Sequence, residues 1–299
     1  MSLQKYLAFL KTVEYGSLTR AAQALNYTQS AISHMLGDLE ADWGLALLER
    51  DRSGVRITSE GLKLLPLIRV VCEGNRDLLA GVEDLSGLRS GLIRIGTLSS
   101  VATHWLPNMI STFQKDYPNI DFELLLGDYE ETEAWLREGR VDCGFLPLPV
   151  KGALESIFLA EDRHLVVIPE NHPLADLPRF PLKTLEDYPF MLLEKGSKSE
   201  ITGIFERHGL TPRIRLTTWD DYAIMALVEK NLGISILPEL ILRRAPYRIV
   251  AKELEEPSFR RIGFVLKNLE KAPLAVRRFM DYLKYRDHGR DEAERATLL

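Results

Sequence analysis

Residues 17–39 hold two short amphipathic segments separated by a break of two residues, and this pattern constrains the fold most strongly. Ser17 is suited to cap the first segment, whose apolar residues recur at helical spacing. Asn26 and Tyr27 form the break, and Thr28 is suited to cap the second segment, which repeats the same spacing. Two such stripes bury against each other, so the sequence predicts a pair of packed helices. The apolar positions are Leu18, Ala21, Ala22 and Leu25, then Ile32, Met35, Leu36 and Leu39.

The outward face of the second helix carries small polar side chains. Glutamine can pair with adenine through two hydrogen bonds, serine can meet a base edge or a phosphate, and glycine leaves room for the close approach of a backbone. This face predicts a helix that lies in a DNA groove, although small polar residues suit a solvated helix face equally well. The residues on it are Gln29, Ser30, Ser33, His34 and Gly37.

The neighbouring segments favour the DNA-binding alternative. A further helical stripe precedes the pair, so three helices can close one small core. Residues 50–57 read as a hairpin with its turn at Ser53 and Gly54, and its three arginines are placed to grip phosphates or to reach into a minor groove. The upstream stripe is formed by Leu3, Tyr6, Leu7, Leu10 and Val13. The residues that we expect to contact DNA are Ser17, Arg20, Thr28, Gln29, Ser30, Ser33, His34, Arg50, Arg52 and Arg56.

Residues 6–61 resemble the winged helix-turn-helix of LysR-type transcriptional regulators, in register and without a gap. The resemblance implies a regulator that binds double-stranded promoter DNA. The chain departs from the family pattern at Ser30, where members often carry proline, and at Leu47-Leu48, where they often carry Leu-Phe; neither change threatens the fold. The matching residues are Phe9, Val13, Gly16, Ser17, Ala21, Ala22, Leu25, Gln29, Ser30, Ser33, Leu39, Glu40, Gly44, Leu47, Leu48, Arg50, Thr58 and Gly61.

Composition limits the class of protein. At 299 residues, with 45% apolar and 27% charged residues, the chain is expected to form two or three globular domains. The formal net charge of -5 does not by itself suggest a nucleic-acid binder. Residues 1–60 hold six Lys and Arg against seven Asp and Glu. We therefore expect the basic groups of this domain to cluster on folding, or two copies of the domain to share the binding of DNA.

No motif for catalysis or metal binding stands out. The cysteines, Cys72 and Cys143, make no metal pattern, and the six histidines are too scattered for a metal site. Glycine-rich phosphate loops and hydrolase nucleophile motifs are absent. We predict no enzyme activity, no cofactor and no metal. The absence of a secretion leader and of a long apolar run predicts a cytoplasmic protein without membrane contact.

From Thr58 to about Arg89 the apolar residues alternate by four and three positions, which is the pattern of a heptad seam. This seam predicts a linker helix that pairs with a second copy of the chain, with Asn75 as a polar residue that fixes the register. The stripe could instead pack on its own domain. Pro66 is expected to kink the helix and to re-aim the DNA-binding head. The seam consists of Gly61, Leu65, Ile68, Cys72, Asn75, Leu79 and Val82.

Beyond Ser90 the sequence alternates short β-rich runs with helical stretches, which predicts parallel sheets in an α/β fold. Two helix starts directly follow strands, one at Ser99 and Ser100 and one at Asp220 and Asp221. Ligands of open α/β sheets gather at such places, outside the carboxyl ends of the strands. The β-rich runs are 92–95, 122–126, 142–146, 165–168, 190–193, 213–217 and 234–237.

This region resembles the effector-binding part of the same family, which is similar to a type 2 periplasmic solute-binding protein with two lobes and a ligand cleft between them. The resemblance implies a multi-domain chain: a mainly α-helical winged helix-turn-helix in residues 1–58, a linker helix in 59–90 and a two-lobed α/β effector-binding domain in 91–299. We expect crossovers near residues 160–161 and 266–267. Lobe one is then formed by residues 91–161 and 268–299, and lobe two by residues 162–267.

In the cleft, Ser99 and Ser100 combine hydroxyl groups with a helix start and suit a carboxylate or a phosphate, although capping alone would also explain them. Asp128 and Asp220 would repel a purely anionic ligand, so we expect an effector with an amine or several hydroxyls, with or without a carboxylate. Asp220 would alternatively serve only as a helix cap. The further cleft residues that the family implies are Gly127, Asp128, Leu146, Pro147, Gly196, Ser197, Trp219 and Asp220.

Together these features predict a ligand-controlled transcription factor. A homodimer or homotetramer would place two recognition helices in successive major grooves of a pseudo-palindromic site, about 34 Å apart. A small acid, amine or hydroxylated metabolite bound between the lobes would change the geometry of the oligomer. Two alternative functions explain less of the sequence. A solute-binding module would leave the predicted DNA-binding head in residues 1–58 without a role, and a fused enzyme would need a nucleophile or a cofactor motif.

Overall fold

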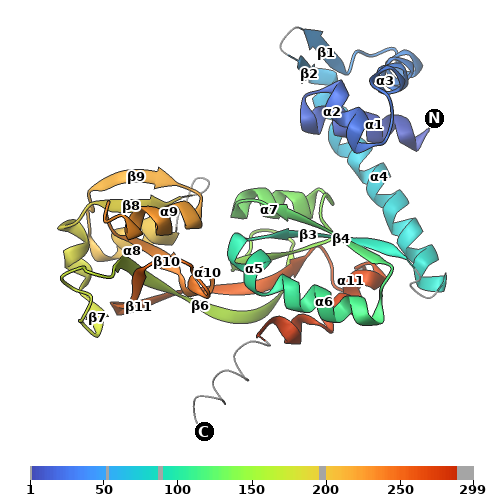
Figure 1. Ribbon diagram of the computed structural model, residues 1–299. Helices are drawn as coiled ribbons and strands as arrows, with labels where there is room; N and C mark the ends of the chain where they lie inside the picture. The colour runs from blue at the N-terminus through green and yellow to red at the C-terminus, as the bar shows by residue number, and fades with distance from the viewer. Residues whose placement is uncertain (1, 52–53, 87–89, 195–199, 288–299) are drawn as a thin grey trace. The chain divides into compact units, whose positions relative to one another are not determined.

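The chain folds as two compact units, Met1–Leu85 and Ser86–Leu299 (Figure 1). Each unit buries apolar side chains of its own. The computed structural model describes residues 2–51, 54–86, 90–194 and 200–287. The unit boundary lies at the end of the long helix, so this helix belongs to the first unit.

The first unit contains the predicted pair of helices. Gly16 ends the helix before the pair in a left-handed conformation with φ of 59°, which favours glycine. The predicted caps are confirmed, because Ser17 Oγ accepts a hydrogen bond from Arg20 N at 3.4 Å and Thr28 Oγ1 accepts one from Ala31 N at 3.2 Å. The elements are α1 (Leu3–Tyr15), α2 (Leu18–Ala24), α3 (Gln29–Trp43), β1 (Leu48–Asp51), β2 (Gly54–Ile57) and α4 (Ser59–Ser86).

The predicted hairpin forms as well, with β1 and β2 antiparallel. Val55 N donates to Gly16 O at 3.1 Å, which ties β2 to the turn between α1 and α2. The carboxylate of Glu40 on α3 accepts hydrogen bonds from the N–H groups of Leu47 and Leu48 at 2.7 and 3.1 Å. The hairpin is therefore fixed to the helical core at both of its ends.

Helix α4 confirms the predicted linker helix and continues through Pro66. Ile68 and Cys72 are buried in the core that also holds Phe9 and Leu36, so the first half of the predicted seam packs on its own unit. Further along α4, several apolar side chains are exposed. They are Leu67, Val70, Val71, Leu78, Leu79 and Val82, the last two at 55% and 54%.

The second unit is built on a seven-stranded mixed sheet with the order β10-β6-β11-β5-β3-β4, with β7 beside β11 and a separate pair β8-β9. Each of the seven predicted β-rich runs matches a strand, although 142–146, 213–217 and 234–237 begin one residue before theirs. The pairs β3-β4, β3-β5 and β8-β9 are parallel, as predicted. In contrast, β6 and β11 are antiparallel to each other, β6 is antiparallel to β10, and β11 is antiparallel to β5. The strands are β3 (Gly91–Thr97), β4 (Ile120–Leu126), β5 (Cys143–Leu148), β6 (Glu155–Pro169), β7 (Arg179–Phe180), β8 (Phe190–Leu193), β9 (Ile214–Thr218), β10 (Ser235–Pro238) and β11 (Ile249–Leu266).

Strands β6 and β11 run through both lobes (Figure 1). β6 changes lobes between Ala160 and His164, where its pairing with β10 begins, close to the predicted crossover. β11 pairs with β7 up to Leu254 and with β5 from Arg261, so it crosses between these residues and not at the predicted 266–267. The error has a physical reason: residues 252–261 are mostly charged and do not read as a strand.

Each lobe has helices around its part of the sheet. Lobe one is packed around Trp105, Phe113 and Phe279, and the last of these lies on α11, so the helix after Pro273 packs in this lobe. None of the helices in the described part of the chain has the length and apolar content that a membrane span requires. The helices of the unit are α5 (Ser99–His104), α6 (Leu106–Asp116), α7 (Tyr129–Arg137), η1 (Leu182–Glu186), α8 (Glu200–His208), α9 (Asp221–Glu229), α10 (Glu239–Leu242), α11 (Leu274–Met280) and η2 (Leu283–Asp287).

Candidate functional site

The first candidate site is the outward face of α3. Gln29, Ser30 and His34 are exposed and Ser33 is half-buried, while Ile32 and Leu36 on the opposite side are fully buried. The periodicity of the helix therefore separates the two faces as the sequence predicts. The face is formed by the first two turns of α3, so its hydroxyl, amide and imidazole groups lie near the N-terminus of this helix, which Thr28 caps.

Two lysines of the first unit take part in ion pairs. Lys5 pairs with Asp42 at 3.1 Å and with Asp38 at 3.5 Å, and Lys11 pairs with Glu14 at 2.9 Å. Asp38 also lies 3.3 Å from His34 Nδ1, so a carboxylate adjoins the outward face of α3. The basic residues among the predicted DNA contacts are four arginines: Arg20 and Arg56 are exposed, Arg50 lies on β1, and Arg52 lies outside the described residues.

The second candidate site is a cavity of about 90 Å³ between the lobes. Lobe one contributes the start of α5 and the start of α7, and lobe two contributes β8, α8 and the start of α9. The crossing strands supply His164 from β6 and Arg260 from β11. The lining residues are Leu98, Ser99, Ser100, Gly127, Asp128, Tyr129, His164, Leu193, Glu200, Ile201, Trp219, Asp221, Pro238 and Arg260.

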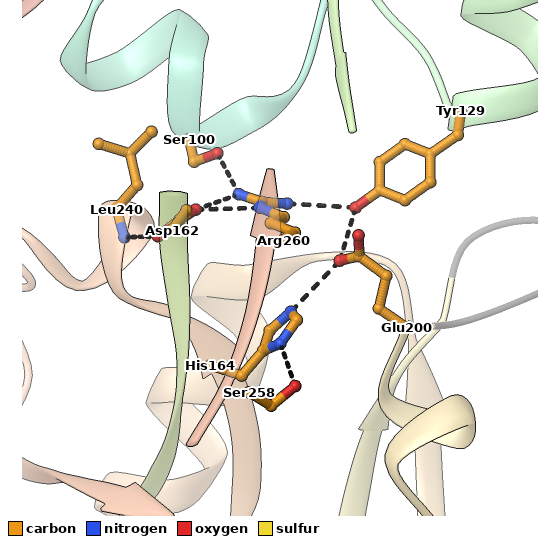
Figure 2. A network of polar contacts seen from close by, with 8 residues as sticks. All are labelled: Ser100, Tyr129, Asp162, His164, Glu200, Leu240, Ser258 and Arg260. Carbon is orange, nitrogen blue, oxygen red and sulfur yellow. Dashed lines mark hydrogen bonds and ion pairs between the residues drawn. The ribbon is translucent and has the colours of Figure 1, made fainter. Parts of the chain in front are cut away.

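Arg260 is the centre of a buried polar network at this cavity (Figure 2). It faces Asp162 across the crossing strands, and its Nε and Nη2 donate to Asp162 Oδ2 at 2.9 and 2.7 Å. The other oxygen of Asp162 accepts from Leu240 N at 2.8 Å. Arg260 Nη2 also donates to Ser100 Oγ at 2.8 Å, and Nη1 donates to the hydroxyl of Tyr129 at 3.1 Å. The guanidinium thus joins the crossing strands to α5 and α7 of lobe one.

Lobe two joins the same network through Glu200 at the start of α8 (Figure 2). Its Oε2 accepts from the Tyr129 hydroxyl at 3.2 Å and lies 3.3 Å from His164 Nε2. The other imidazole nitrogen of His164 lies 3.1 Å from Ser258 Oγ on β11. Tyr129 is therefore the residue of lobe one at which Arg260 and Glu200 converge.

Burial and charge act in opposite directions on these groups. Burial raises the pKa of the Tyr129 hydroxyl well above its ordinary value, so this group stays neutral and can both accept and donate. Burial would lower the pKa of Arg260, but the nearby Tyr129, Asp162 and Glu200 raise it above its ordinary value. The pKa of Glu200 is lowered because its contacts with His164, Arg260 and Tyr129 outweigh its burial.

The cavity collects part of the predicted effector set. Ser99, Ser100, Gly127, Asp128 and Trp219 line it. Ser99 and Ser100 are the first residues of α5, whose cap position is Leu98, and Ser100 is held by Arg260.

Other predicted residues lie elsewhere. Leu146 is buried among Leu136, Val141 and Val265, and Pro147 on β5 pairs with Ile262; neither lines the cavity. The predicted Gly196 and Ser197 lie outside the described residues.

Asp128 and Asp220 have the same local role. Asp128 caps α7 in a capping box with Glu131, and Asp220 caps α9 by accepting from Tyr222 N at 2.9 Å and Ala223 N at 3.2 Å. Asp128 also lines the cavity, whereas Asp220 does not and its neighbour Asp221 does. Asp220 therefore caps α9, and its role toward an effector stays a prediction.

Sequence reasoning missed Tyr129, Glu200 and Arg260, and it counted His164 only among scattered histidines. Arg260 and Asp162 are far apart in the chain and meet only because β6 and β11 pair. The sequence did contain a weak signal for these two residues: a run of apolar residues begins within a few positions after Asp162 and after Arg260. Within the described residues, no three His, Cys, Asp or Glu side chains come together in a way that would hold a metal ion.

Comparisons with known proteins match a family model to each of the two units. Residues 3–62 match the family model described as bacterial regulatory helix-turn-helix protein, lysR family, and residues 86–287 match the model of the LysR substrate binding domain. An uncharacterized HTH-type transcriptional regulator, YvbU of Bacillus subtilis, is 31% identical over 287 residues, which cover 95% of this chain and 98% of that protein.

Two solved structures share the fold over nearly the whole chain. A full-length OxyR variant from Pseudomonas aeruginosa has a TM-score of 0.70 at 18% identity, with 95% of each chain covered. Full-length CbnR complexed with its target DNA has a TM-score of 0.67 at 22% identity, with 96% of this chain and 100% of that chain covered.

Proposed function

The chain belongs to the LysR family of DNA-binding transcriptional regulators, and on this premise we propose that the outward face of α3 reads its promoter site and that a small molecule binds between its lobes. The observation that carries the proposal is the buried network around Arg260, which joins both lobes at a cavity. Cavities at the ends of strands in open α/β sheets are the usual place for a ligand.

The DNA-reading role rests on the geometry of the first unit. Gln29, Ser30 and His34 are exposed on α3, and Arg20 and Arg56 are exposed on the neighbouring elements. A recognition helix contacts base edges with its first turns, while arginines on adjacent elements contact phosphates. CbnR, which shares the fold, has been solved with its target DNA.

Regulators of this family form oligomers, and we assign this chain a homodimer, or a homotetramer made of dimers, through α4. The exposed side chains of Leu67, Val71 and Leu78 lie four and seven residues apart on one side of this helix. Apolar side chains that are exposed along one helix face gain stability when a second helix covers them. Two recognition helices would then meet successive major grooves, about 34 Å apart, on a pseudo-palindromic site.

Regulation would follow from the way in which the network couples the lobes. A ligand that binds the two arrangements of the lobes with unequal affinity shifts the equilibrium between them. The altered packing would change the spacing of the heads or the bend of the DNA, and so the activity of the promoter.

Selection of genomic fragments with the purified protein, followed by footprinting, tests the DNA-reading role. We expect one protected pseudo-palindrome, and we expect the variant Gln29→Ala, Ser33→Ala to lose it. Gln4→Ala, an exposed glutamine on α1, is the matched control and should keep it. A full-length protein that enriches no sequence at moderate salt, or an α3 variant that retains the footprint, would refute this role.

The ligand-binding role is tested on the recovered site. Operator affinity and footprint are measured with and without a library of small metabolites, in the parent protein and in Arg260→Met. We expect at least one compound to change the footprint of the parent only. A compound that acts equally on both proteins would place the effector outside this cavity.

A further inference from the structure

The hydroxyl of Tyr129 occupies the point of the cavity where charges of opposite sign face each other. It accepts from Arg260 Nη1 at 3.1 Å and donates to Glu200 Oε2 at 3.2 Å (Figure 2). Tyr129 belongs to lobe one, whereas Arg260 lies on a crossing strand and Glu200 on lobe two. Any group that enters between Arg260 and Glu200 must replace or extend this pair of hydrogen bonds.

Each of the two charges already has a partner. Arg260 pairs with Asp162 at 2.7 Å, and the two side chains are only 6% and 4% exposed. Glu200 lies 3.3 Å from His164, whose side chain is 2% exposed. Asp162 is further held by Leu240 N at 2.8 Å, so pulling Arg260 toward a new anion would leave a buried carboxylate without its cation.

A charged ligand group is therefore disfavoured at this point, whatever its sign. A carboxylate there would face Glu200, and an ammonium there would face the guanidinium of Arg260. A neutral hydroxyl can accept from Arg260 and donate to Glu200 with one atom, as the Tyr129 hydroxyl does. Buried polar groups that lose a partner are costly, so the two groups select a ligand that satisfies both.

We propose that the effector of this protein is a neutral molecule whose hydroxyl group, of the alcohol or phenol class, takes the place of the Tyr129 hydroxyl between Arg260 and Glu200. The proposal rests on the role of the cavity as the effector site. It narrows the chemical classes of effector that the sequence left open, which included amines and carboxylates. Tyr129 is then the internal competitor of the ligand, and its release is the step that uncouples α7 of lobe one from α8 of lobe two.

The rest of the cavity agrees with a small hydroxylated compound. Its volume of about 90 Å³ is several times the roughly 10–15 Å³ that a single water molecule needs, so the cavity has room for a small compound. Leu98, Ile201 and Pro238 offer apolar surface for a carbon skeleton, and the hydroxyls of Ser99 and Ser100 offer further hydrogen bonds.

Three probes of similar size and different charge test the proposal: 1-butanol, n-butylammonium and butyrate. Their dissociation constants are measured by ligand-observed NMR with the full-length protein and with Tyr129→Phe, which keeps the ring and removes the hydroxyl. We expect 1-butanol to bind about tenfold more tightly to Tyr129→Phe, because it supplies the missing partner of two buried groups. The two ions should gain nothing.

Two further variants keep the test specific. Tyr282→Phe removes a tyrosine hydroxyl that donates to the carboxylate of Asp116 at 2.5 Å, away from the cavity, and should leave all three dissociation constants unchanged. Glu200→Gln removes the negative charge, so butyrate should bind at least about tenfold more tightly than to the parent. Circular dichroism and thermal unfolding check that each variant is folded.

The possible results show whether the proposed class of ligand is wrong or whether the proposed role of the cavity as the effector site is wrong. If an ion gains most from Tyr129→Phe, the hydroxyl class is wrong while the cavity remains the effector site. If no probe binds Tyr129→Phe more tightly than the parent, the proposed hydroxyl subsite is refuted. If the probes bind but neither Tyr129→Phe nor Glu200→Gln alters their affinities, the role of the cavity is refuted together with the proposal.

Discussion

Asp162 and Arg260 face each other on the two strands that connect the lobes, and both Nε and Nη2 of Arg260 donate to the same oxygen of Asp162. The pair thus lies at the crossing of β6 and β11, where each strand changes lobes. Since the same guanidinium also contacts Ser100 and Tyr129, a change in the position of lobe one alters the contacts of a buried charge. Because of these contacts, a ligand that binds at the crossing can change the positions of both lobes.

Removal of Arg260 should destabilise the second unit strongly. Arg260→Met leaves Asp162 buried without its cation, and breaking a buried pair in this way costs about 3–5 kcal/mol. The free energy of unfolding from urea titration, followed by far-ultraviolet circular dichroism, measures the loss. The double variant Asp162→Leu, Arg260→Met should recover part of it, because neither charge of the pair is then left buried without its partner.

Arg163, one residue after Asp162, provides the matched control. It pairs with Glu239 at 2.9 Å, but its side chain is 49% exposed. Exposed pairs contribute about 0–1 kcal/mol, so Arg163→Ala should leave the unfolding midpoint almost unchanged. Equal losses for Arg163→Ala and Arg260→Met would show that burial of the Arg260 pair does not matter for stability.

The sequence predicted local structure well and tertiary contacts poorly. The caps at Ser17 and Thr28 and all seven β-rich runs are read from neighbouring residues, and such short-range patterns are visible without a structure. Arg260 and Glu200 became visible only in the fold, because the pairing of β6 with β11 brings Arg260 to Asp162 and the packing of the lobes brings Glu200 to Tyr129. The charged run on β11 hid its strand, since burial and pairing there override local propensity.

Gly61 at the start of α4 is predicted to tolerate no side chain. A Cβ at this position would lie 2.5 Å from the backbone oxygen of Leu47, and such overpacking costs about 1–3 kcal/mol. Gly61→Ala should therefore lower the melting temperature of the first unit. Gly74→Ala on the same helix meets nothing within 4 Å and should raise helix stability by about 0.5–1 kcal/mol. Opposite signs for the two variants, measured by calorimetry, are the expected result.

His172 should make the second unit sensitive to mild acid. Burial lowers its pKa below the ordinary 6.5, so the unfolded chain takes up a proton before the folded protein does. The contribution of His172 to the free energy of unfolding is therefore fully present above about pH 6.5. It decreases as the pH falls toward the lower pKa of the folded state. His172→Asn keeps an acceptor for Leu174 N and should flatten the dependence of the unfolding free energy on pH between 7.5 and 5.

The role of His172 is checked by comparing the pH dependence of the unfolding free energy in the parent protein and in His172→Asn under the same conditions. A slope that stays unchanged in His172→Asn would contradict the role of this buried imidazole.

Gly37 distinguishes a DNA-reading face from a solvated one. It lies exposed on α3, and an added Cβ would meet nothing within 4 Å in the free protein, so Gly37→Ala should stabilise the helix by about 0.5–1 kcal/mol. If a DNA backbone or base edge approaches this surface closely, the same methyl group should weaken operator binding, as measured by fluorescence anisotropy. Gln4→Ala on α1, the control variant for the α3 face, should leave operator affinity unchanged. A Gly37→Ala protein that is more stable and binds the operator with full affinity would mean that DNA does not approach α3 at this turn.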